Sequence, residues 1–437
     1  MPTVLFQKAS LKILFFFLLL AAFSAEAETE KDTSRDLYRD LSAPQNELAH
    51  QALNQAYSAD PDEAHATLET MRKLEAAQNL PPLSFLLSMA IDVMRFQNGD
   101  FENAEAEKIL RLSIEKAAAD GSVLCQQGLK KEKEHPTYLF IQGGLRGFLA
   151  TLKIHSNPSK AMNEGYQALK LLERSLAKDD RIKDGNMGTG IFYCTVAKSP
   201  FFIRATLKIL GRSASMNQGL QSLRISAYQG QYTCVASQLF LIQFLSPYED
   251  DVRREKRIIF KTLQETYPKN PYFTFLKTDE ALCFYPDSFY RTGMRKELLR
   301  RIVAFDTTDF YGRYYANLVR YQLTLLSSKA TRRVMPDTSI PLRDYRYYPV
   351  FMEALRRRHI LQDSAKSDKI RSEALTTMKT MRDSCFKLIK SSPMNPTRKR
   401  YYRWHVSDAL RWRGKHNENT VEEEQRDTSF LDLPKDE

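Results

Sequence analysis

The sequence MNQGLQSLRISAYQGQYTCVASQLFLIQFLSPYEDDVRREKRIIFKTLQETYPKNPYFTFL, from Met216 to Leu276, contains three amphipathic helical patterns with turn residues at each joint. In the first pattern, apolar residues lie at positions 220, 223, 225 and 227. Gly230 follows, and we expect it to take the left-handed conformation that stops a helix. Consecutive amphipathic helices of this kind are typical of a stacked helical-repeat protein.

The second and third helices of this stretch also have a predicted buried face. Tyr232 is expected to pack over the turn that precedes the second helix. Ser246 and Pro247 are predicted to start the third helix, and Pro268 and Pro271 to end it and begin the next. The buried faces are predicted to be Ala236, Leu239, Phe240 and Phe244 in the second helix, and Val252, the stem of Lys256, Ile259, Leu263 and Tyr267 in the third.

Similar helix signals precede this stretch. Pro44 is predicted to open a helix, and Asp60-Pro61 gives the next helix an N-cap and a first-turn proline. Pro81 and Pro82 begin a third, and further helices are predicted over residues 101–119, 136–154 and 158–177. The turn at residues 99–104 has the same glycine and aromatic pattern as the turn at 230–232, which indicates a recurring unit.

Two glycine-rich stretches could be taken for phosphate-binding loops. Residues 143–147, GGLRG, lie inside an apolar helical pattern and lack the Gly-Lys-Ser/Thr ending of a phosphate loop. We therefore expect a helix in which glycines let another backbone pack closely. Residues 185–190, GNMGTG, do not have dinucleotide-binding spacing, and we interpret them as a loop that leads into a packed helix.

The order of these features resembles a family of exported bacterial proteins with tetratricopeptide-like helical hairpins. The resemblance covers roughly residues 45–285, although the strict 34-residue tetratricopeptide pattern is not met. It implies a right-handed stack of helix pairs used for binding or scaffolding, with no catalytic residues to carry over. The features are Asp60-Pro61 with Ala64, Gly143-Gly144, Asp184 to Tyr193, Gly211, Gly219 to Ala227, Gly230 to Thr233, and Tyr267 to Pro271.

The first residues have the pattern of a secretory signal peptide. Lys8 and Lys12 precede an apolar run over residues 13–23, and Ala25-Glu26-Ala27 has the small-residue pattern of a cleavage site. We predict cleavage after Ala27 and a periplasmic or secreted location, with outer-membrane association as an open alternative. The apolar run is about half of the roughly twenty residues that a membrane span needs, so no transmembrane segment is expected after signal removal.

Charge is distributed unevenly along the chain. Residues 28–150 hold 13 Lys and Arg against 20 Asp and Glu, residues 417–437 hold 2 against 8, and residues 151–416 carry a net charge of +24. Such a basic region attracts an anionic partner or the chain's own acidic ends. The five cysteines are widely spaced and odd in number, which predicts small buried residues with at most one disulfide.

The C-terminal third is rich in aromatic and basic residues. We interpret the aromatic residues from Tyr285 to Tyr321 as core and hairpin-packing residues, in preference to a ligand-stacking site. Cations alternate with aromatic rings at residues 398–404 and 411–413, as in sites for phosphates or sugars. The candidate anion-binding residues are Arg346, Arg398, Lys399, Arg400, Tyr401, Tyr402, Arg403, Trp404, Arg411 and Trp412. The structural alternative is that both tryptophans cover the end of the stack and the arginines are solvated or pair with the acidic tail.

No catalytic or cofactor motif is present. The seven histidines are isolated, and His405-Val406-Ser407-Asp408 cannot form a line of nucleophile and base because adjacent helix positions point in different directions. We therefore expect no enzyme, cofactor or metal site. The predicted organisation is a signal peptide at 1–27, a flexible segment at 28–43, a helical-repeat domain at 44–335, a basic aromatic helical region at 342–416 and a disordered acidic tail at 417–437.

The predicted fold is an all-α, tetratricopeptide-like solenoid of stacked helix hairpins. The predicted function is non-catalytic protein binding or scaffolding in the bacterial cell envelope. The alternative is binding of, or action on, an anionic glycan through the basic aromatic region. An exported protein is separated from nucleic acid, so we expect no nucleic-acid partner.

Overall fold

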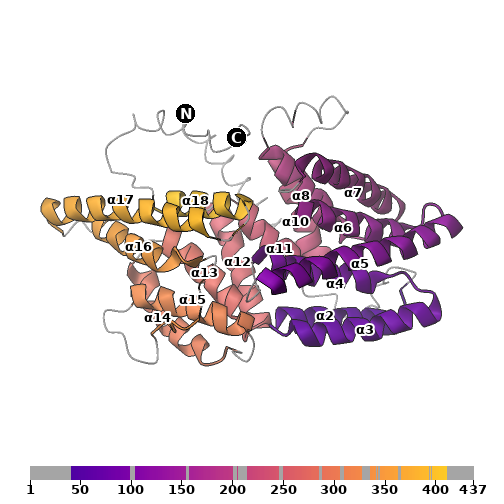
Figure 1. Cartoon of the computed structure of the whole chain (residues 1–437), viewed down its shortest axis with the longest axis horizontal. Helices are drawn as coiled ribbons and strands as arrows, with labels where there is room; N and C mark the ends of the chain where they lie inside the picture. The colour runs from indigo at the N-terminus through magenta and orange to yellow at the C-terminus, as the bar shows by residue number, and fades with distance from the viewer. Residues whose placement is uncertain are drawn as a thin grey trace, which may run out of the picture. The chain divides into compact units, whose positions relative to one another are not determined.

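A computed structural model describes residues 41–98, 104–153, 157–199, 204, 214–245, 250–284, 288–305, 310–326, 335–340, 342, 345–362, 366–392, 394 and 396–410. Within these ranges the chain forms sixteen helices and no strand. Figure 1 shows how the helices are arranged. The predicted all-α class is confirmed. The predicted signal peptide, most of the flexible segment and the acidic tail lie outside the described residues.

Six helices begin within two residues of the predicted prolines at 44, 61, 81, 136, 158 and 271. The helix predicted over residues 101–119 ends later, at Lys131, and the start predicted at Ser246 lies outside the described residues. The helices are α2 (Ala43–Tyr57), α3 (Pro61–Gln78), α4 (Leu83–Asn98), α5 (Ala104–Lys131), α6 (Pro136–Lys153), α7 (Pro158–Lys178), α8 (Gly185–Ala197), α10 (Met216–Gln229), α11 (Cys234–Phe244), α12 (Asp250–Thr266), α13 (Pro271–Phe284), α14 (Ser288–Ile302), α15 (Phe310–Leu326), α16 (Tyr348–Gln362), α17 (Asp368–Ser391) and α18 (Pro396–Ala409).

Neighbouring helices in the sequence pack against each other in space. Helices α2 to α8 contact their successors, and α2, α4, α6 and α8 also contact one another in turn. This order of contacts is compatible with the predicted stack of helix hairpins. None of the helices within the described ranges is both long enough and apolar enough to cross a membrane.

The turn between α10 and α11 is held by a carboxylate from another part of the chain. Asp184, buried at the start of α8, accepts hydrogen bonds from the backbone nitrogens of Gln231, Tyr232 and Thr233 at 3.0, 2.8 and 2.6 Å. It therefore satisfies donors at the start of α11 that have no partner within the helix. The hydroxyl of Thr233 also donates to Asp184, at 2.6 Å.

Gly230 does not take the predicted left-handed conformation. Its φ is −70° and its ψ is 148°, which is extended backbone. Glycine is needed there for another reason, because a Cβ would lie 2.5 Å from the carbonyl oxygen of Ser226 and 3.0 Å from Asp184. The close approach of the Ser226 carbonyl oxygen, and next of the capping carboxylate, explains this glycine, rather than a positive φ.

Residues 231–276 also contact the first described helix. The Tyr232 hydroxyl donates to Asn46 of α2 at 2.7 Å, instead of packing only over its own turn. The side-chain amide of Asn270 donates to the Tyr57 carbonyl oxygen at 2.8 Å. The stretch that decides the fold is therefore joined to α2 by one buried and one partly buried hydrogen bond, as well as to its own neighbours.

Two predictions on this stretch were wrong in detail. The buried residues of α11 are Ser237, Gln238 and Leu241, and the predicted face of Ala236, Leu239, Phe240 and Phe244 is half-buried. The reason is that α11 contacts α10 through hydrogen-bonded polar side chains, such as Ser237 Oγ to Ser226 Oγ at 2.8 Å. In α12 the whole Lys256 side chain is buried, not just its stem, because its Nζ pairs with Glu280 at 3.0 Å.

The glycine-rich stretches are helical and lie at helix crossings. Gly143 and Gly144 are inside α6, as predicted, and Cβ atoms there would lie 2.8 Å from Leu172 and 2.6 Å from Leu86. Residues 185–190 belong to α8, so the predicted loop is a helix. A Cβ on Gly190 would lie 2.9 Å from the carbonyl oxygen of Gly219, which shows that α8 and α10 approach at their backbones.

The C-terminal helices share one hydrophobic cluster. It contains buried residues from Phe275 to Leu410, on both sides of the predicted boundary at residues 336–341. Tyr314, Tyr315, Tyr347 and Tyr348 are among its largest fully buried side chains, and the first two were predicted to be core residues. All five cysteines are free thiols; Cys234 is half-buried and the other four are buried.

Candidate functional site

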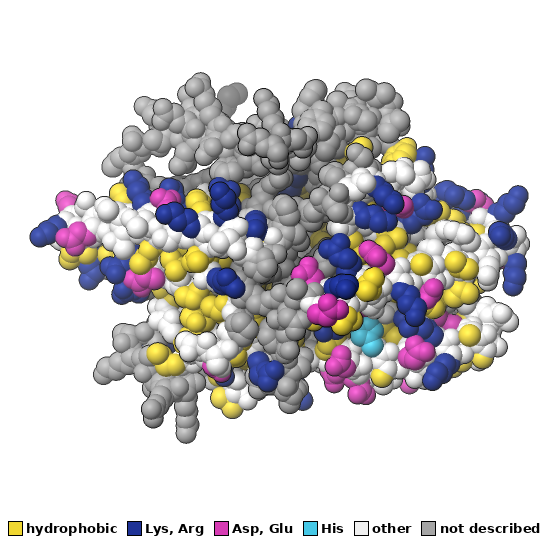
Figure 2. All heavy atoms as spheres, viewed as in Figure 1, with side chains coloured by type: hydrophobic (Ala, Val, Ile, Leu, Met, Phe, Trp, Pro, Cys, Tyr) yellow, Lys and Arg dark blue, Asp and Glu magenta, His cyan; other side chains and the backbone are white. Residues whose placement is uncertain are grey.

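Helix α18 carries most of the predicted anion-binding residues and packs beside α17 (Figure 1). Lys and Arg side chains lie along this helix pair at the upper left of Figure 2. The side chains of Arg398, Arg400 and Tyr401 lie outside the described set, as do residues Arg411 and Trp412. The remaining five residues divide into a packed group and an exposed group.

Tyr402 and Lys399 have structural contacts. The Tyr402 hydroxyl donates to the Tyr345 hydroxyl at 2.6 Å, and their ring centroids are 5.1 Å apart. Lys399 donates from its Nζ to the carbonyl oxygen of Lys390 at 2.8 Å, in the last turn of α17. This contact satisfies a carbonyl that has no partner within the helix. Both side chains thus fasten α18 to its neighbours.

Arg403, Trp404 and Arg346 are exposed. The Arg403 guanidinium carbon lies 5.3 Å from the ring centroid of Phe386, and the guanidinium carbon of Arg382 lies 5.9 Å from the same ring. Trp404 is 48% exposed. Arg346 lies in the turn before α16. The structure therefore places one predicted cation, Arg403, with a second cation that the sequence analysis did not single out, on one aromatic ring of α17.

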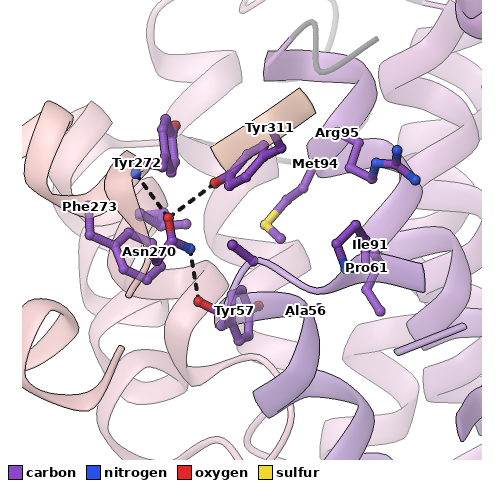
Figure 3. A pocket seen from close by; sticks show the side chains of 12 residues that line it. Ala56, Tyr57, Pro61, Ile91, Met94, Arg95, Asn270, Tyr272, Phe273 and Tyr311 are labelled. Atoms are coloured by element: carbon purple, nitrogen blue, oxygen red, sulfur yellow. Dashed lines mark hydrogen bonds between the residues drawn. The ribbon is translucent and has the colours of Figure 1, made fainter. Parts of the chain in front are cut away.

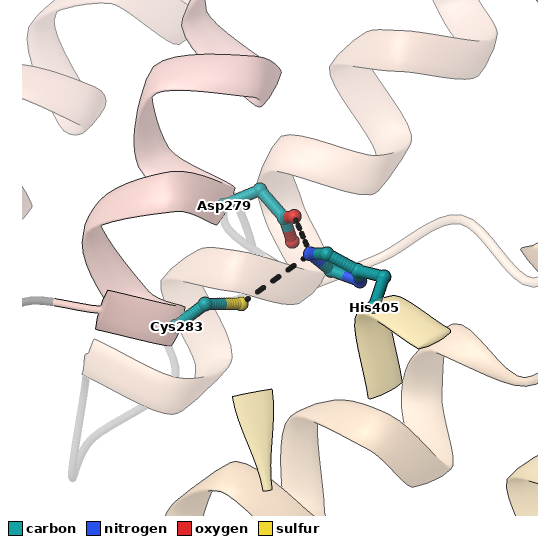
Figure 4. Close-up of side chains that lie close together, drawn as sticks. All are labelled: Asp279, Cys283 and His405. Atoms are coloured by element: carbon teal, nitrogen blue, oxygen red, sulfur yellow. Dashed lines mark hydrogen bonds and ion pairs between the residues drawn. The ribbon is translucent and has the colours of Figure 1, made fainter. Parts of the chain in front are cut away.

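The inner side of α18 carries a different chemistry, which the sequence analysis missed. His405 points between Asp279 and Cys283 of α13, as Figure 4 shows. Its Nε2 lies 2.9 Å from Asp279 Oδ2 and 3.7 Å from Cys283 Sγ. The three ligand-type atoms all lie within 4.8 Å of one another. We call Asp279, Cys283 and His405 the α13–α18 cluster.

Local sequence explains half of this arrangement. Asp279 and Cys283 are four residues apart on α13, so their side chains lie on the same face of the helix. The four-residue spacing of a carboxylate and a thiol on a predicted helix was therefore enough to predict that these two side chains lie together. His405 is 122 residues beyond Cys283, and no sequence pattern predicts the contact between them.

Buried neighbours hold the two helices of the cluster in place. The Tyr348 hydroxyl donates to Asp279 Oδ1 at 2.7 Å and accepts from Gln322 at 2.8 Å. Arg358 of α16 donates from one nitrogen to the carbonyl oxygens of Cys283 and Ala409. One guanidinium thus joins the ends of the helices that carry Cys283 and His405.

Burial and nearby negative charge oppose each other at His405 and act together at Cys283. Burial tends to lower the pKa of His405, but Asp279 foremost, with Glu280 and Asp408, raises this pKa above its ordinary value. Burial raises the pKa of the Cys283 thiol well above its ordinary value, and the charge of Asp279 adds to the effect. The raised pKa values favour the protonated form of both groups, which is an imidazolium beside Asp279 and a neutral thiol at Cys283.

A second polar cluster in the first helices also contains a histidine. His65 Nε2 lies 2.9 Å from Asp92 Oδ1, and Ser113 donates to the other oxygen of Asp92 at 2.8 Å. Ser88 Oγ lies 3.4 Å from His65 Nδ1. These are the residue types of a hydrolase triad, but Ser88 is only 3% exposed, so a substrate cannot reach its hydroxyl in this conformation.

A hollow lies where α2, α3 and α4 meet α11, α13 and α15 (Figure 3). At its side, Asn270 accepts from the Tyr272 backbone nitrogen at 2.9 Å and from the Tyr311 hydroxyl at 3.4 Å, and donates to the Tyr57 carbonyl oxygen. Aromatic and aliphatic side chains form most of its wall, with Arg95 as its one cation. The polar groups of Asn270 are thus used in joining helices.

Comparisons of the chain with protein-family models, with curated proteins and with solved structures found no match. Function is therefore inferred from the geometry of the described residues.

Proposed function

We propose that this chain is a non-catalytic binding protein in which stacked helix pairs present a surface to another protein. The observation that carries the proposal is the order of helix contacts. Each helix from α2 to α7 contacts the next, and α2, α4, α6 and α8 also contact one another in turn. Helix pairs that stack in this order leave long helix faces exposed along the stack, and helical-repeat proteins use such faces to bind their partners.

Helix α5 offers the surface for such a partner. Its side chains at Ile109, Leu112, Val123 and Leu124 are between 41% and 60% exposed. Ile109, Leu112 and Val123 lie on one side of the helix, because their separations are close to whole turns, and they extend over about 21 Å. Exposed apolar side chains at both ends of one helix face support an interaction site on α5.

The partner that fits this surface is an amphipathic helix. A facing helix would place apolar side chains against both ends of the α5 surface, at the spacing of helix-on-helix packing. Between these ends α5 exposes Lys116 and Asp120. A matching partner therefore carries charged residues of both signs in the middle of its contact face.

The test is capture from the native cell envelope, with quantification by mass spectrometry. We expect one defined protein at a fixed ratio to the full chain. The double variant Leu112→Glu with Val123→Glu should lose it, because charges would be buried on binding. Ile370→Glu, at an exposed apolar residue of α17, is the matched control and should keep it. A protein retained equally by both variants would contradict the α5 surface.

A second candidate function is binding of an anionic glycan on α17 and α18. The favouring observation is that Arg382 and Arg403 lie against the same ring, Phe386, with Trp404 exposed on the next residue of α18. Guanidinium groups held beside aromatic rings suit acidic sugars, which offer both charge and apolar ring faces. This candidate concerns a different surface from the α5 proposal, so the two can be tested separately.

Binding to acidic polysaccharides tests the second candidate. We expect affinity to fall steeply between low and moderate salt, because exposed charges are screened. It should be lost in the variant Arg382→Glu with Arg403→Glu and kept in Lys261→Glu, whose side chain is exposed on α12. Equal binding by all three proteins would rule out this surface.

Export to the cell envelope is part of the proposal. It is supported by the sequence pattern of residues 1–27, which lie outside the described residues. N-terminal sequencing of the protein made in its native cell should find Glu28 as the first residue. A protein that starts at Met1 or Pro2 would contradict export by a cleaved signal.

A further inference from the structure

We propose that the α13–α18 cluster of Asp279, Cys283 and His405 is a binding site for one divalent transition-metal ion of the Zn²⁺ class. The cluster offers a thiol sulfur, an imidazole nitrogen and a carboxylate oxygen. Zn²⁺ accepts all three donor types, whereas Ca²⁺ and Mg²⁺ require oxygen ligands. The donor set therefore selects a borderline or soft cation.

The distances are close to those of a tetrahedral site. With bond lengths of about 2.3 Å to sulfur and about 2.0 Å to nitrogen or oxygen, tetrahedral geometry separates sulfur from nitrogen by about 3.5 Å and nitrogen from oxygen by about 3.3 Å. The observed separations are 3.7 Å from Cys283 Sγ to His405 Nε2 and 2.9 Å from His405 Nε2 to Asp279 Oδ2. Shifts of a few tenths of an ångström at the side chains would admit the ion.

The direction of His405 also fits a ligand. The nitrogen that faces both Asp279 and Cys283 is the same atom, Nε2. A cation bound between the three residues takes the place of the hydrogen on this nitrogen. Figure 4 shows that Asp279 and Cys283 approach the ring from α13 on this one edge.

Charge balance favours the bound ion in this buried position. Carboxylate and thiolate together carry two negative charges, which neutralise a divalent cation when the imidazole is neutral. Binding thus converts the His405–Asp279 ion pair and the Cys283 thiol into a neutral group, and up to about two protons leave Nε2 and Sγ for solvent per ion. No oxidant, reductant or further reactant is needed.

The neighbours of the cluster are suited to orient its ligands. Tyr348 donates to Asp279 Oδ1 and leaves Oδ2 facing His405. Arg358 holds the carbonyl oxygens of Cys283 and Ala409, so it fixes the helix ends that carry two of the three ligands. Hydrogen bonds of this kind around ligands are typical of metal sites. Three protein ligands leave a fourth position for water or for a further side chain.

The experiment uses the full chain, freed of metal with a chelator, and titrates it with Co²⁺ and Zn²⁺. Native mass spectrometry should show one ion per chain. Co²⁺ should produce the near-ultraviolet absorption of a cobalt–thiolate bond, and Zn²⁺ should abolish it by displacement. Wild-type protein that binds no ion, or binds Co²⁺ without this absorption, would overturn the proposal.

Variants assign the site. Cys283→Ser should lose the cobalt–thiolate absorption, and His405→Gln and Asp279→Asn should each weaken Zn²⁺ binding at least about 10-fold. Cys385→Ser, at a buried thiol of α17, is the matched control and should keep both signals. Persistence of the absorption in Cys283→Ser would refute the assignment.

A substitution at buried Cys283 can also prevent folding. A second variant, which leaves Cys283 unchanged, therefore tests whether this cysteine binds the ion. A chain that keeps Cys283 as its sole cysteine, with Ser at positions 125, 194, 234 and 385, should retain the absorption. If wild type shows the absorption but this folded variant does not, another cysteine binds the ion and the proposed site is wrong.

Discussion

Two histidine–aspartate pairs occur among the described residues, one in the first helices and one in the last. In both pairs the His Nε2 lies 2.9 Å from a carboxylate oxygen. Their surroundings differ. The His65 side chain is 30% exposed, whereas the His405 side chain is 10% exposed. The hydroxyls of Ser88 and Ser113 lie next to the His65–Asp92 pair, and the thiol of Cys283 lies next to the His405–Asp279 pair.

The difference shows that distance alone does not define what such a pair does. Water can solvate His65 when its partner is removed, but it has little access to His405. Hydroxyl neighbours donate hydrogen bonds to a carboxylate, and a thiol neighbour adds a metal ligand. The N-terminal pair therefore stabilises helix packing, and the C-terminal pair has the donor set of a cation site.

The largest expected effect is on stability, when the aspartate of each pair is replaced by alanine. Asp279→Ala leaves His405 and the Tyr348 hydroxyl without their buried acceptor, and should lower the free energy of unfolding by about 3–5 kcal/mol. Asp92→Ala should cost only about 1–2 kcal/mol, because water reaches His65. Urea denaturation in the presence of a chelator measures both. Equal losses would show that exposure is not the deciding difference.

The cost of Asp279→Ala should also depend on pH. The pKa of His405 is raised in the folded protein, so its contribution to stability is complete below its ordinary value of about 6.5 and is lost as the pH rises through the raised value. The variant should therefore lose more stability at about pH 6 than at about pH 9. A loss that is the same at both pH values would mean that the ion pair contributes nothing.

The next largest effect concerns a buried carboxyl group that has no histidine. Glu75 of α3 accepts from the Ser84 backbone nitrogen and from Gln45, each at 2.9 Å. Burial raises the pKa of Glu75 to about 7, against the lowering effect of these hydrogen bonds. Between about pH 4.5 and about pH 7 the folded chain keeps a proton that the unfolded chain releases, so stability falls as pH rises through this window.

Glu75→Gln removes this titration and keeps the shape of the side chain. The variant should be more stable than wild type by up to about 3 kcal/mol at about pH 8, with little difference at about pH 4. Denaturation curves across this range measure the change, and Glu115→Gln, at an exposed position of α5, should not alter stability. A variant that is less stable at all pH values would show that the carboxylate is needed for its acceptor geometry.

Local signals explain which parts of the fold the sequence predicts. Asp60 caps α3, and Pro271 starts α13, because caps and prolines act on the backbone within one turn. The turn at residues 231–233 depends instead on Asp184, which is 47 to 49 residues away. No local pattern indicates such a partner, so the helix ends were predictable and the cap of α11 was not.

The candidate sites show the same limit. Cation and aromatic spacing singled out residues 398–404, and the structure uses Tyr402 for core packing while it holds Arg403 on Phe386. The contact of His405 with Asp279 joins α18 to α13, two helices that both contribute to the hydrophobic cluster of the C-terminal helices. Such a site depends on tertiary packing, which helical periodicity does not determine.

The smallest expected effects test the hydroxyls around His65. Ser113→Ala removes a 2.8 Å hydrogen bond to the Asp92 carboxylate and should cost about 1.5 kcal/mol. Ser88→Ala removes a contact of 3.4 Å to His65 Nδ1, which is too long for a strong hydrogen bond, and should cost about 0.5 kcal/mol or less. Thermal unfolding of the two variants gives the comparison. An equal cost for Ser88→Ala and Ser113→Ala would mean that a continuous line of hydrogen bonds runs through Ser88, His65 and Asp92. The N-terminal pair would then need a test with acyl substrates.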